Sequence, residues 1–166
     1  MRENTKQFKK HQAMTLVELL IYLAITMIVL VVVIDLVTRV AQVKSQSVGQ
    51  EEVSANARFL TDRITYAVQA SSSIDGSYPS NDLNLTVNGL ATAFSLNSGQ
   101  IFYTEGFATP VALTNTLVEI VPPEGGNIFT KITNGSSSVI QVIFQVRFKQ
   151  NNFTRDFQTS VLARGK

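Results

Sequence analysis

The sequence predicts an α+β chain: a long N-terminal α-helix, first transmembrane and then amphipathic, packed on a C-terminal antiparallel β-sheet. Three observations predict it: an apolar run at residues 14–34, apolar residues at helical spacing up to residue 70, and short alternating segments separated by turn residues. These observations divide the chain into residues 1–13, 14–34, 35–70 and 71–166.

Length and charge restrict the class of protein. At 166 residues the chain has room for one domain and an anchor. Four of the 14 Lys and Arg residues and one of the 12 acidic residues lie in the first 13 positions, which leaves 10 basic against 11 acidic residues in a nearly neutral remainder. The absence of cysteine excludes a disulfide framework, a thiolate zinc site and a cysteine nucleophile.

The apolar run Met14–Ile34 contains 21 residues and one charge, Glu18. About 20 apolar residues suffice to cross a bilayer as a helix. Lys9 and Lys10 precede the run, and Asp35 ends it, so we expect the N-terminus on the cytoplasmic side. The small residue Ala13 stands before the run, where signal peptidase would not cleave.

Glu18 is the most informative residue. A carboxylate at the centre of a membrane helix costs about 2.5–3.5 kcal/mol, and less near an end. Glu18 lies about one turn inside the run, so it could reach the lipid headgroups. Alternatively it has a function, which requires a partner cation at the same membrane depth.

The string Lys9-Lys10-His11-Gln12-Ala13, followed by Met14-Thr15-Leu16-Val17-Glu18-Leu19-Leu20-Ile21, resembles the class III prepilin signal of type IV pilins and type II secretion pseudopilins. The resemblance implies that residues 1–13 are a basic leader, removed by a prepilin peptidase between Ala13 and Met14. It also implies N-methylation of Met14, and a Glu18 carboxylate that neutralises the amino terminus of a neighbouring subunit. The family usually has Gly and Phe where this chain has Ala13 and Met14.

The resemblance therefore implies a structural subunit without a cofactor: a minor pilin or pseudopilin of a type IV pilus, a type II secretion pseudopilus or a DNA-uptake filament. Its partners would be the prepilin peptidase, other pilin or pseudopilin subunits and an assembly platform in the inner (cytoplasmic) membrane, from which the filament extends outside the cytoplasm. The missing disulfide, Ala13 and Met14 favour a minor subunit, and Glu18 argues against the tip pseudopilins that lack this residue. A plain single-span protein with an extracytoplasmic binding domain is the alternative, and a retained leader would favour it.

Beyond Asp35 the helix becomes one-sided. Apolar residues recur three and four positions apart, at Leu36, Val40 and Val43 and then at Val53, Ala57, Leu60, Ile64 and Ala67. Gly49 lies among small polar residues and is the expected soft point of the helix. The Ser71-Ser72-Ser73 run is expected to end it. Because strands follow, we expect this stripe to pack on a sheet and not to form a coiled-coil dimer.

The remainder predicts strands. Leu83–Val87 and Leu90–Leu96 flank the Asn88-Gly89 hairpin signal, and Val111–Val121, then Ile128–Thr133, are two further expected strands. In the last hairpin, apolar residues alternate from Ile140 to Phe148. A two-residue turn at Asn151-Asn152 would place four pairs opposite each other: Phe148 and Arg155, Val146 and Phe157, Val142 and Val161, Arg147 and Asp156.

We expect no enzyme and no metal site. After residue 13 the chain has neither His nor Cys, so a general base would have to be Asp, Glu, Lys or Tyr. The carboxylates of residues 71–166 form no close pair, and neither a phosphate-binding glycine loop nor EF-hand spacing is present.

A DNA-binding pilin is the alternative from another functional class. Arg147 and Lys149 share one face of an expected strand, and Arg155 and Arg164 lie near them in sequence. Basic clusters can contact phosphates. A solvated strand face with Asp156 as the partner of Arg147 is the simpler explanation, and steep salt dependence of DNA binding would separate the two.

Overall fold

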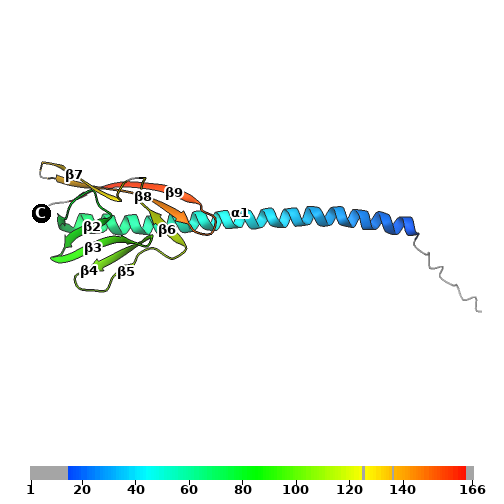
Figure 1. The fold of residues 1–166 in the computed structure, drawn as a ribbon, viewed down its shortest axis with the longest axis horizontal. Helices are drawn as coiled ribbons and strands as arrows, with labels where there is room; N and C mark the ends of the chain where they lie inside the picture. The colour runs from blue at the N-terminus through cyan, green and yellow to red at the C-terminus, as the bar shows by residue number, and fades with distance from the viewer. Residues whose placement is uncertain (1–14, 125, 136, 164–166) are drawn as a thin grey trace, which may run out of the picture. The chain divides into compact units, whose positions relative to one another are not determined.

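The computed structural model describes residues 15–124, 126–135 and 137–163, and the chain divides into two compact units, residues 1–43 and 44–166. The first unit is described from Thr15 and consists of the first part of helix α1 (Leu16–Ala70) (Figure 1). The described residues of the second unit form the rest of α1 and nine strands. The predicted α+β arrangement, one long helix packed against antiparallel sheets, is confirmed.

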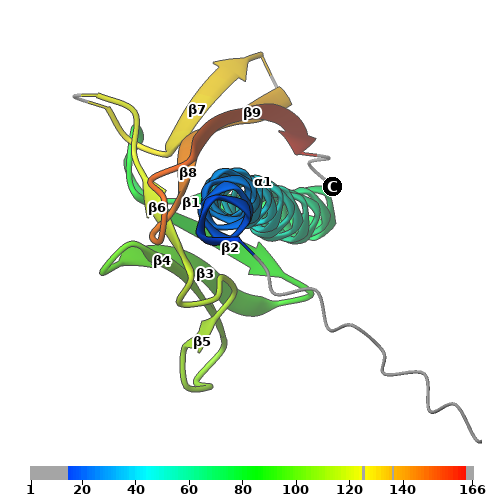
Figure 2. The ribbon, with the colours of Figure 1, turned by 90° about the vertical axis from the view of Figure 1, so that its right-hand side faces the viewer.

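Within the second unit, α1 lies between two antiparallel sheets (Figure 2). The predicted apolar stripe is confirmed from Val53 onward, because Val53, Ala57, Leu60, Ile64 and Ala67 are all buried. Burial in α1 begins at Gly49, whereas Leu36, Val40 and Val43 are exposed. The part of the helix that packs on sheets is therefore shorter than the amphipathic segment 35–70.

The first sheet has five strands in sequence order: β1 (Ser71–Asp75), β2 (Asp82–Val87), β3 (Leu90–Asn97), β4 (Gln100–Glu105) and β5 (Val111–Ala112). The hairpin at Asn88-Gly89 is confirmed, and both residues have positive φ angles, 51° and 79°, as a type I′ turn requires. The helix ends at Ala70 as expected, and the serine run that follows begins β1, a strand that the sequence did not predict.

The second sheet contains β6 (Val118–Val121), β7 (Phe129–Asn134), β8 (Ser137–Phe148) and β9 (Thr154–Ala163). Strand β9 pairs with β8 along almost its whole length, and β6 and β7 share the opposite edge of β8. The buried side chains of this second sheet pack with those of α1 and the first sheet in one core. The largest fully buried side chains of this core are Phe94, Phe129, Phe144 and Phe148.

The expectation of one strand over Val111–Val121 is wrong. The segment forms β5 and β6, separated by a bend in which Asn115 Oδ1 accepts hydrogen bonds from the N–H groups of Leu117 and Val118 at 3.1 and 3.2 Å. The N–H of Asn115 donates to Asn56 Oδ1 of α1 at 3.0 Å. These contacts carry the chain from one sheet to the other.

The predicted register of the last hairpin is also wrong, by two residues. Val146 lies opposite Arg155, Phe144 opposite Phe157, and Ile140 opposite Val161. The connection is longer than a two-residue turn, because Asn151 Oδ1 accepts from Phe153 N–H at 3.0 Å and Phe148 N–H donates to Phe153 O at 2.8 Å. A shift of two keeps every side chain on its predicted face.

Gly49 has a different role from the expected soft point. Helix α1 continues through it, and the residue is buried. A Cβ atom at this position would lie 3.0 Å from Phe148 Cδ1 and 3.1 Å from Asn151 Nδ2, and that amide donates to Ser45 O at 3.3 Å. The glycine allows the β8–β9 loop to lie directly against the helix.

Candidate functional site

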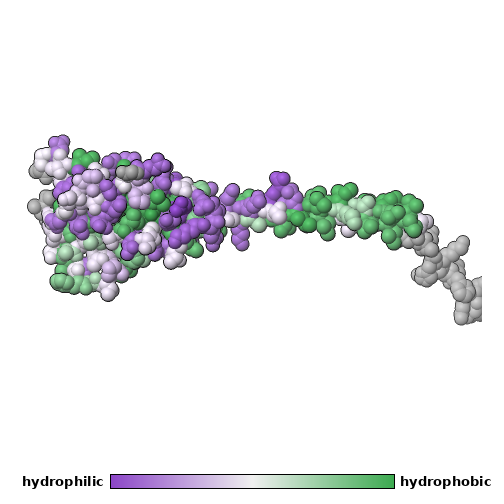
Figure 3. All heavy atoms as spheres, viewed as in Figure 1, coloured by the Kyte–Doolittle hydropathy of each residue, from purple (hydrophilic) through white to green (hydrophobic). Residues whose placement is uncertain are grey.

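The apolar part of α1, residues 16–34, has no partner among the residues that the structure describes. Its large apolar side chains, from Leu16 to Ile34, are between 47% and 76% exposed. Figure 3 shows this hydrophobic surface in green. Nineteen residues of helix extend about 28 Å, close to the roughly 30 Å of a bilayer core. Within the described residues, α1 is the one helix long and apolar enough to span a membrane, which fits a single-pass anchor.

The helix begins at a polar cap. Thr15 precedes the first helical residue, and its Oγ1 accepts a hydrogen bond from the N–H of Glu18 at 3.3 Å. The Thr15 carbonyl accepts from Leu19 N–H at 3.1 Å. Thr-x-x-Glu is the spacing of a capping box, and a carboxylate in the first turn is favoured by the helix dipole. The cap therefore explains the presence of Glu18 at the start of the helix by local structure, an explanation that the sequence pattern alone did not suggest.

The Glu18 carboxylate accepts a hydrogen bond from one described side chain. The hydroxyl of Tyr22 donates to Glu18 Oε1 at 3.4 Å, and Glu18 forms no ion pair with any described residue. Lys9, Lys10, Ala13 and Met14, to which the sequence analysis assigns the leader charge, cleavage and methylation, lie outside the described residues.

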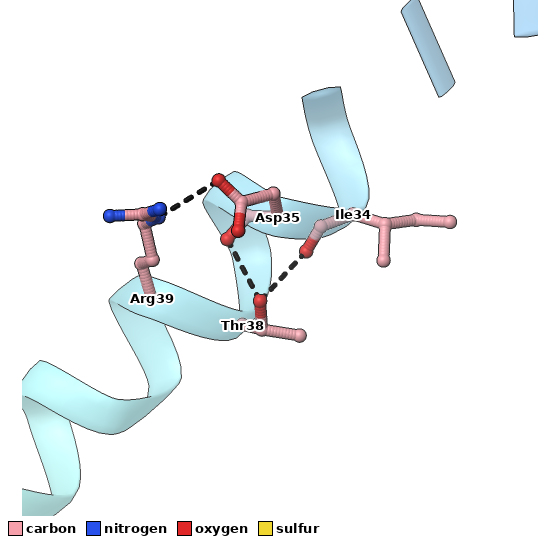
Figure 4. A network of polar contacts seen from close by, with 4 residues as sticks. All are labelled: Ile34, Asp35, Thr38 and Arg39. Carbon is pink, nitrogen blue, oxygen red and sulfur yellow. Dashed lines mark hydrogen bonds and ion pairs between the residues drawn. The ribbon is translucent and has the colours of Figure 1, made fainter. Parts of the chain in front are cut away.

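Asp35 and Arg39 close the apolar segment (Figure 4). Arg39 Nε lies 2.8 Å from Asp35 Oδ2, and Thr38 Oγ1 donates to the carbonyls of Ile34 and Asp35 at 3.1 and 2.8 Å. Both ionic side chains are highly exposed, so the pair contributes only about 0.3–0.5 kcal/mol to helix stability. Its significance is its position, because a paired Asp and Arg are expensive in lipid and favour an aqueous boundary at residue 35.

Two of the basic residues considered for DNA contact, Arg147 and Arg155, lie on opposite faces of the second sheet. Arg147 extends from β8 and pairs with Glu119 of β6, with Nη2 and Oε2 2.6 Å apart. Arg155 lies on β9 opposite the buried Val146, on the other face of the sheet, where its guanidinium donates to Ser54 Oγ at 3.5 Å. Lys149 follows the end of β8, and Arg164 lies outside the described residues.

Two tyrosines of the second unit have a pKa above the ordinary value. Burial raises the pKa of Tyr78, although a hydrogen bond from the N–H of Asn84 opposes this shift. Burial also raises the pKa of Tyr103, and its hydrogen bond to Glu105 at 3.0 Å adds to the shift. Both hydroxyls therefore stay protonated at neutral pH. No group of three His, Cys, Asp or Glu residues with metal-site geometry occurs in the described part of the chain.

Comparison with known families identifies a motif at the start of α1. A family model described as the prokaryotic N-terminal methylation motif matches residues 8–34, which include Glu18 and the whole exposed apolar run. Neither the curated proteins nor the solved structures contained a match. The motif is the class III prepilin signal, so it supports a type IV pilin-like or pseudopilin subunit.

Proposed function

We propose that the chain is a non-enzymatic structural subunit, a minor pilin or pseudopilin, of a type IV pilus, a type II secretion pseudopilus or a DNA-uptake filament. The observation that carries the proposal is the methylation motif at residues 8–34, together with the exposure of every large apolar side chain of α1 from Leu16 to Ile34. A helix of this kind needs an apolar environment, which a bilayer and then a bundle of similar helices would provide.

Processing would separate the leader from the helix. A prepilin peptidase would cut between Ala13 and Met14, so that residues 1–13 stay on the cytoplasmic side, and would methylate the new amino group. The helix cap at Thr15 lies one residue beyond the new terminus. Cleavage would thus release an amine close to the start of an already capped helix.

Glu18 would guide assembly. Opposite unit charges 4 Å apart attract by about 4 kcal/mol at an effective dielectric constant of about 20. The apolar side chains around Glu18 provide little to choose one register over another, because lipid chains are as apolar as they are. A single carboxylate that meets the terminal amine of a neighbouring subunit can therefore select the register.

The second unit would supply the surface of the subunit. Its core is formed by one face of α1 and both sheets, so its fold does not depend on the apolar residues 16–34. The proposed partners are the peptidase, other pilin or pseudopilin subunits and the membrane assembly platform. Because Arg147 is paired and Arg155 lies on the opposite sheet face, we propose no role for them in DNA binding.

The test is the intact mass and N-terminal sequence of the protein isolated from its native membrane. A chain that begins at N-methylated Met14 would support the proposal. The matched variant Glu18→Gln keeps the size of the side chain and removes its charge; it should be processed normally but be lost from sheared filaments. A chain that retains residues 1–13 in the presence of active peptidase would contradict the proposal and favour a simple membrane-anchored domain.

A further inference from the structure

The polar residues of the apolar segment all lie on one face of the helix. Between residues 15 and 34 the polar side chains are Thr15, Glu18, Tyr22 and Thr26, at successive intervals of three, four and four. Residues three or four apart are neighbours on a helix surface. We call these four residues the polar ladder.

Hydrogen bonds connect the ladder from end to end. Thr15 Oγ1 accepts from Glu18 N–H, the Tyr22 hydroxyl donates to Glu18 Oε1, and Thr26 Oγ1 donates to Tyr22 O at 2.7 Å. Tyr22 reaches Glu18 because side chains on a helix lean toward its N-terminus. The hydroxyls of Tyr22 and Thr26 both donate within the ladder, but Glu18 Oε2 has no hydrogen-bond partner among the described residues.

A charged oxygen in an apolar segment needs a cation, and the described part of this segment has none. Glu18 is the one charged side chain between residues 15 and 34, and the first basic residue beyond it is Arg39, 21 positions further along. After the proposed cleavage, a second, parallel copy of the chain would bring the amine of Met14 to within four residues of the same depth, about 6 Å along the axis. Charge complementarity therefore favours a second copy as the occupant of this face.

We propose that Tyr22 is a positioning residue for assembly: its hydroxyl holds Oε1 of Glu18 and leaves Oε2 directed to the amino terminus of a second copy, which docks along the polar ladder. The proposal rests on the function proposed above and adds to it the contact face and a residue outside the Thr15–Glu18 cap. The Glu18–Tyr22 pair by itself stabilises an isolated helix only slightly, so its effect must be measured between copies.

Cross-linking the full-length chain in its native membrane tests the proposal. The chain has no cysteine, so a single introduced thiol can be cross-linked with a short bis-maleimide. Val29 lies seven residues after Tyr22, on the ladder face, whereas Val31 lies on the opposite face. V29C should give cross-linked pairs of the chain, and the matched V31C should give far fewer.

The variant Tyr22→Phe removes the hydroxyl and keeps the ring. In the V29C background it should lower the yield of cross-linked pairs about threefold, because a misplaced Glu18 should weaken the contact between copies by about as much as the loss of one average side-chain hydrogen bond between membrane helices. Because Tyr22 is proposed to act through Glu18, Tyr22→Phe should cause no further loss of cross-linked pairs in a chain that already carries Glu18→Gln. Tyr66→Phe, which removes an exposed hydroxyl from the same helix in the second unit, should leave the yield unchanged.

Each other outcome overturns part of the reasoning. Equal yields with Tyr22 and with Phe at this position, or an effect that simply adds to that of Glu18→Gln, would overturn the positioning role. Cross-links to a different protein alone, or equal yields from V29C and V31C, would overturn docking of a second copy along the ladder. Failure of the proposed function is distinguishable, because the chain would then keep its leader and V29C would give no cross-linked pairs.

Discussion

Replacing Gly49 with alanine tests whether the β8–β9 loop needs a position without a side chain on α1. Alanine is favoured over glycine in a helix interior by about 1 kcal/mol. The new methyl group would lie 3.0 Å from Phe148 Cδ1 and 3.1 Å from Asn151 Nδ2. The exposed Asn151 can move aside, but Phe148 is only 1% exposed and is held by the core.

The magnitude follows from these two opposing effects. Overpacking a core by one methyl group costs about 1–3 kcal/mol, which exceeds the helical gain. We expect a net destabilisation of about 1 kcal/mol, equivalent to a fall of about 3–5 °C in the midpoint of thermal unfolding for a unit of this size. A smaller side chain at Phe148 should remove the clash and reverse the sign.

The assay is thermal unfolding of the full chain in detergent micelles, followed by circular dichroism. Gly49→Ala should lower the midpoint in the natural sequence and raise it in a Phe148→Leu background. Ser47→Ala, at an exposed position of the same helix, controls for helix propensity. A higher midpoint for Gly49→Ala in the natural sequence would refute the packing argument and restore the view of Gly49 as a soft point.

Three further predictions concern processing, a second glycine and alkaline pH. Ala13→Leu should leave the leader attached while Ala13→Gly is processed normally, as intact mass would reveal; efficient cleavage of the leucine variant would move the cleavage site elsewhere. Gly99→Ala should destabilise the chain by about 2–4 kcal/mol in chemical unfolding, because Gly99 has a φ of 74° and a Cβ would lie 2.6 Å from Glu119 Cγ; a change below about 0.5 kcal/mol would contradict this. The pKa values of Tyr78 and Tyr103 are higher in the folded chain than in the unfolded chain, where a tyrosine has a pKa of about 10. Their contribution to stability is therefore fully present below about pH 10, and it should be lost as the pH rises through the folded pKa values. A double phenylalanine variant should lose less stability between about pH 9 and pH 12, and an unchanged slope would show that other groups dominate.

The elements that sequence predicts well are those encoded by local patterns. The stripe from Val53 to Ala67 has helical spacing, and the structure buries each of its members. Asn88 and Gly89 can adopt positive φ angles at low cost, so the hairpin between β2 and β3 was readable from two residues. The strict alternation in β8 likewise predicted which of its side chains face the core.

The failures arose where distant partners decide the structure. Strand β1 is a serine-rich segment with little strand propensity, and its pairing with β2 is what makes it a strand. The β8–β9 register depends on how Asn151 folds the connecting loop, which no alternation pattern encodes. Because of this shift, Arg147 does not pair with Asp156 as expected but with Glu119. Glu119 lies on β6, which the sequence predicted as part of one strand with β5.

Part of the candidate site could be predicted from the sequence. Glu18 is conspicuous in sequence as the one charge in an apolar run. The Thr15, Tyr22 and Thr26 positions could have been found from their spacing to Glu18, since the signal is a polar face of period three to four. The role of Gly49 required the structure, because its neighbours Phe148 and Asn151 lie about 100 positions away in sequence.

The two halves of α1 bury their apolar surface in different ways, and this difference explains why one carboxylate can matter. From Val53 to Val68 the helix is covered by its own sheets, whereas the large apolar side chains of residues 16–34 leave on the order of tens of kcal/mol of burial to be supplied from outside the chain. Under the proposed function, a bilayer supplies that burial first and other subunits supply it later. Because both environments are equally apolar, the transfer itself favours no particular neighbour or register. Selectivity must then come from the few polar groups of the segment, and the polar ladder around Glu18 is where they lie.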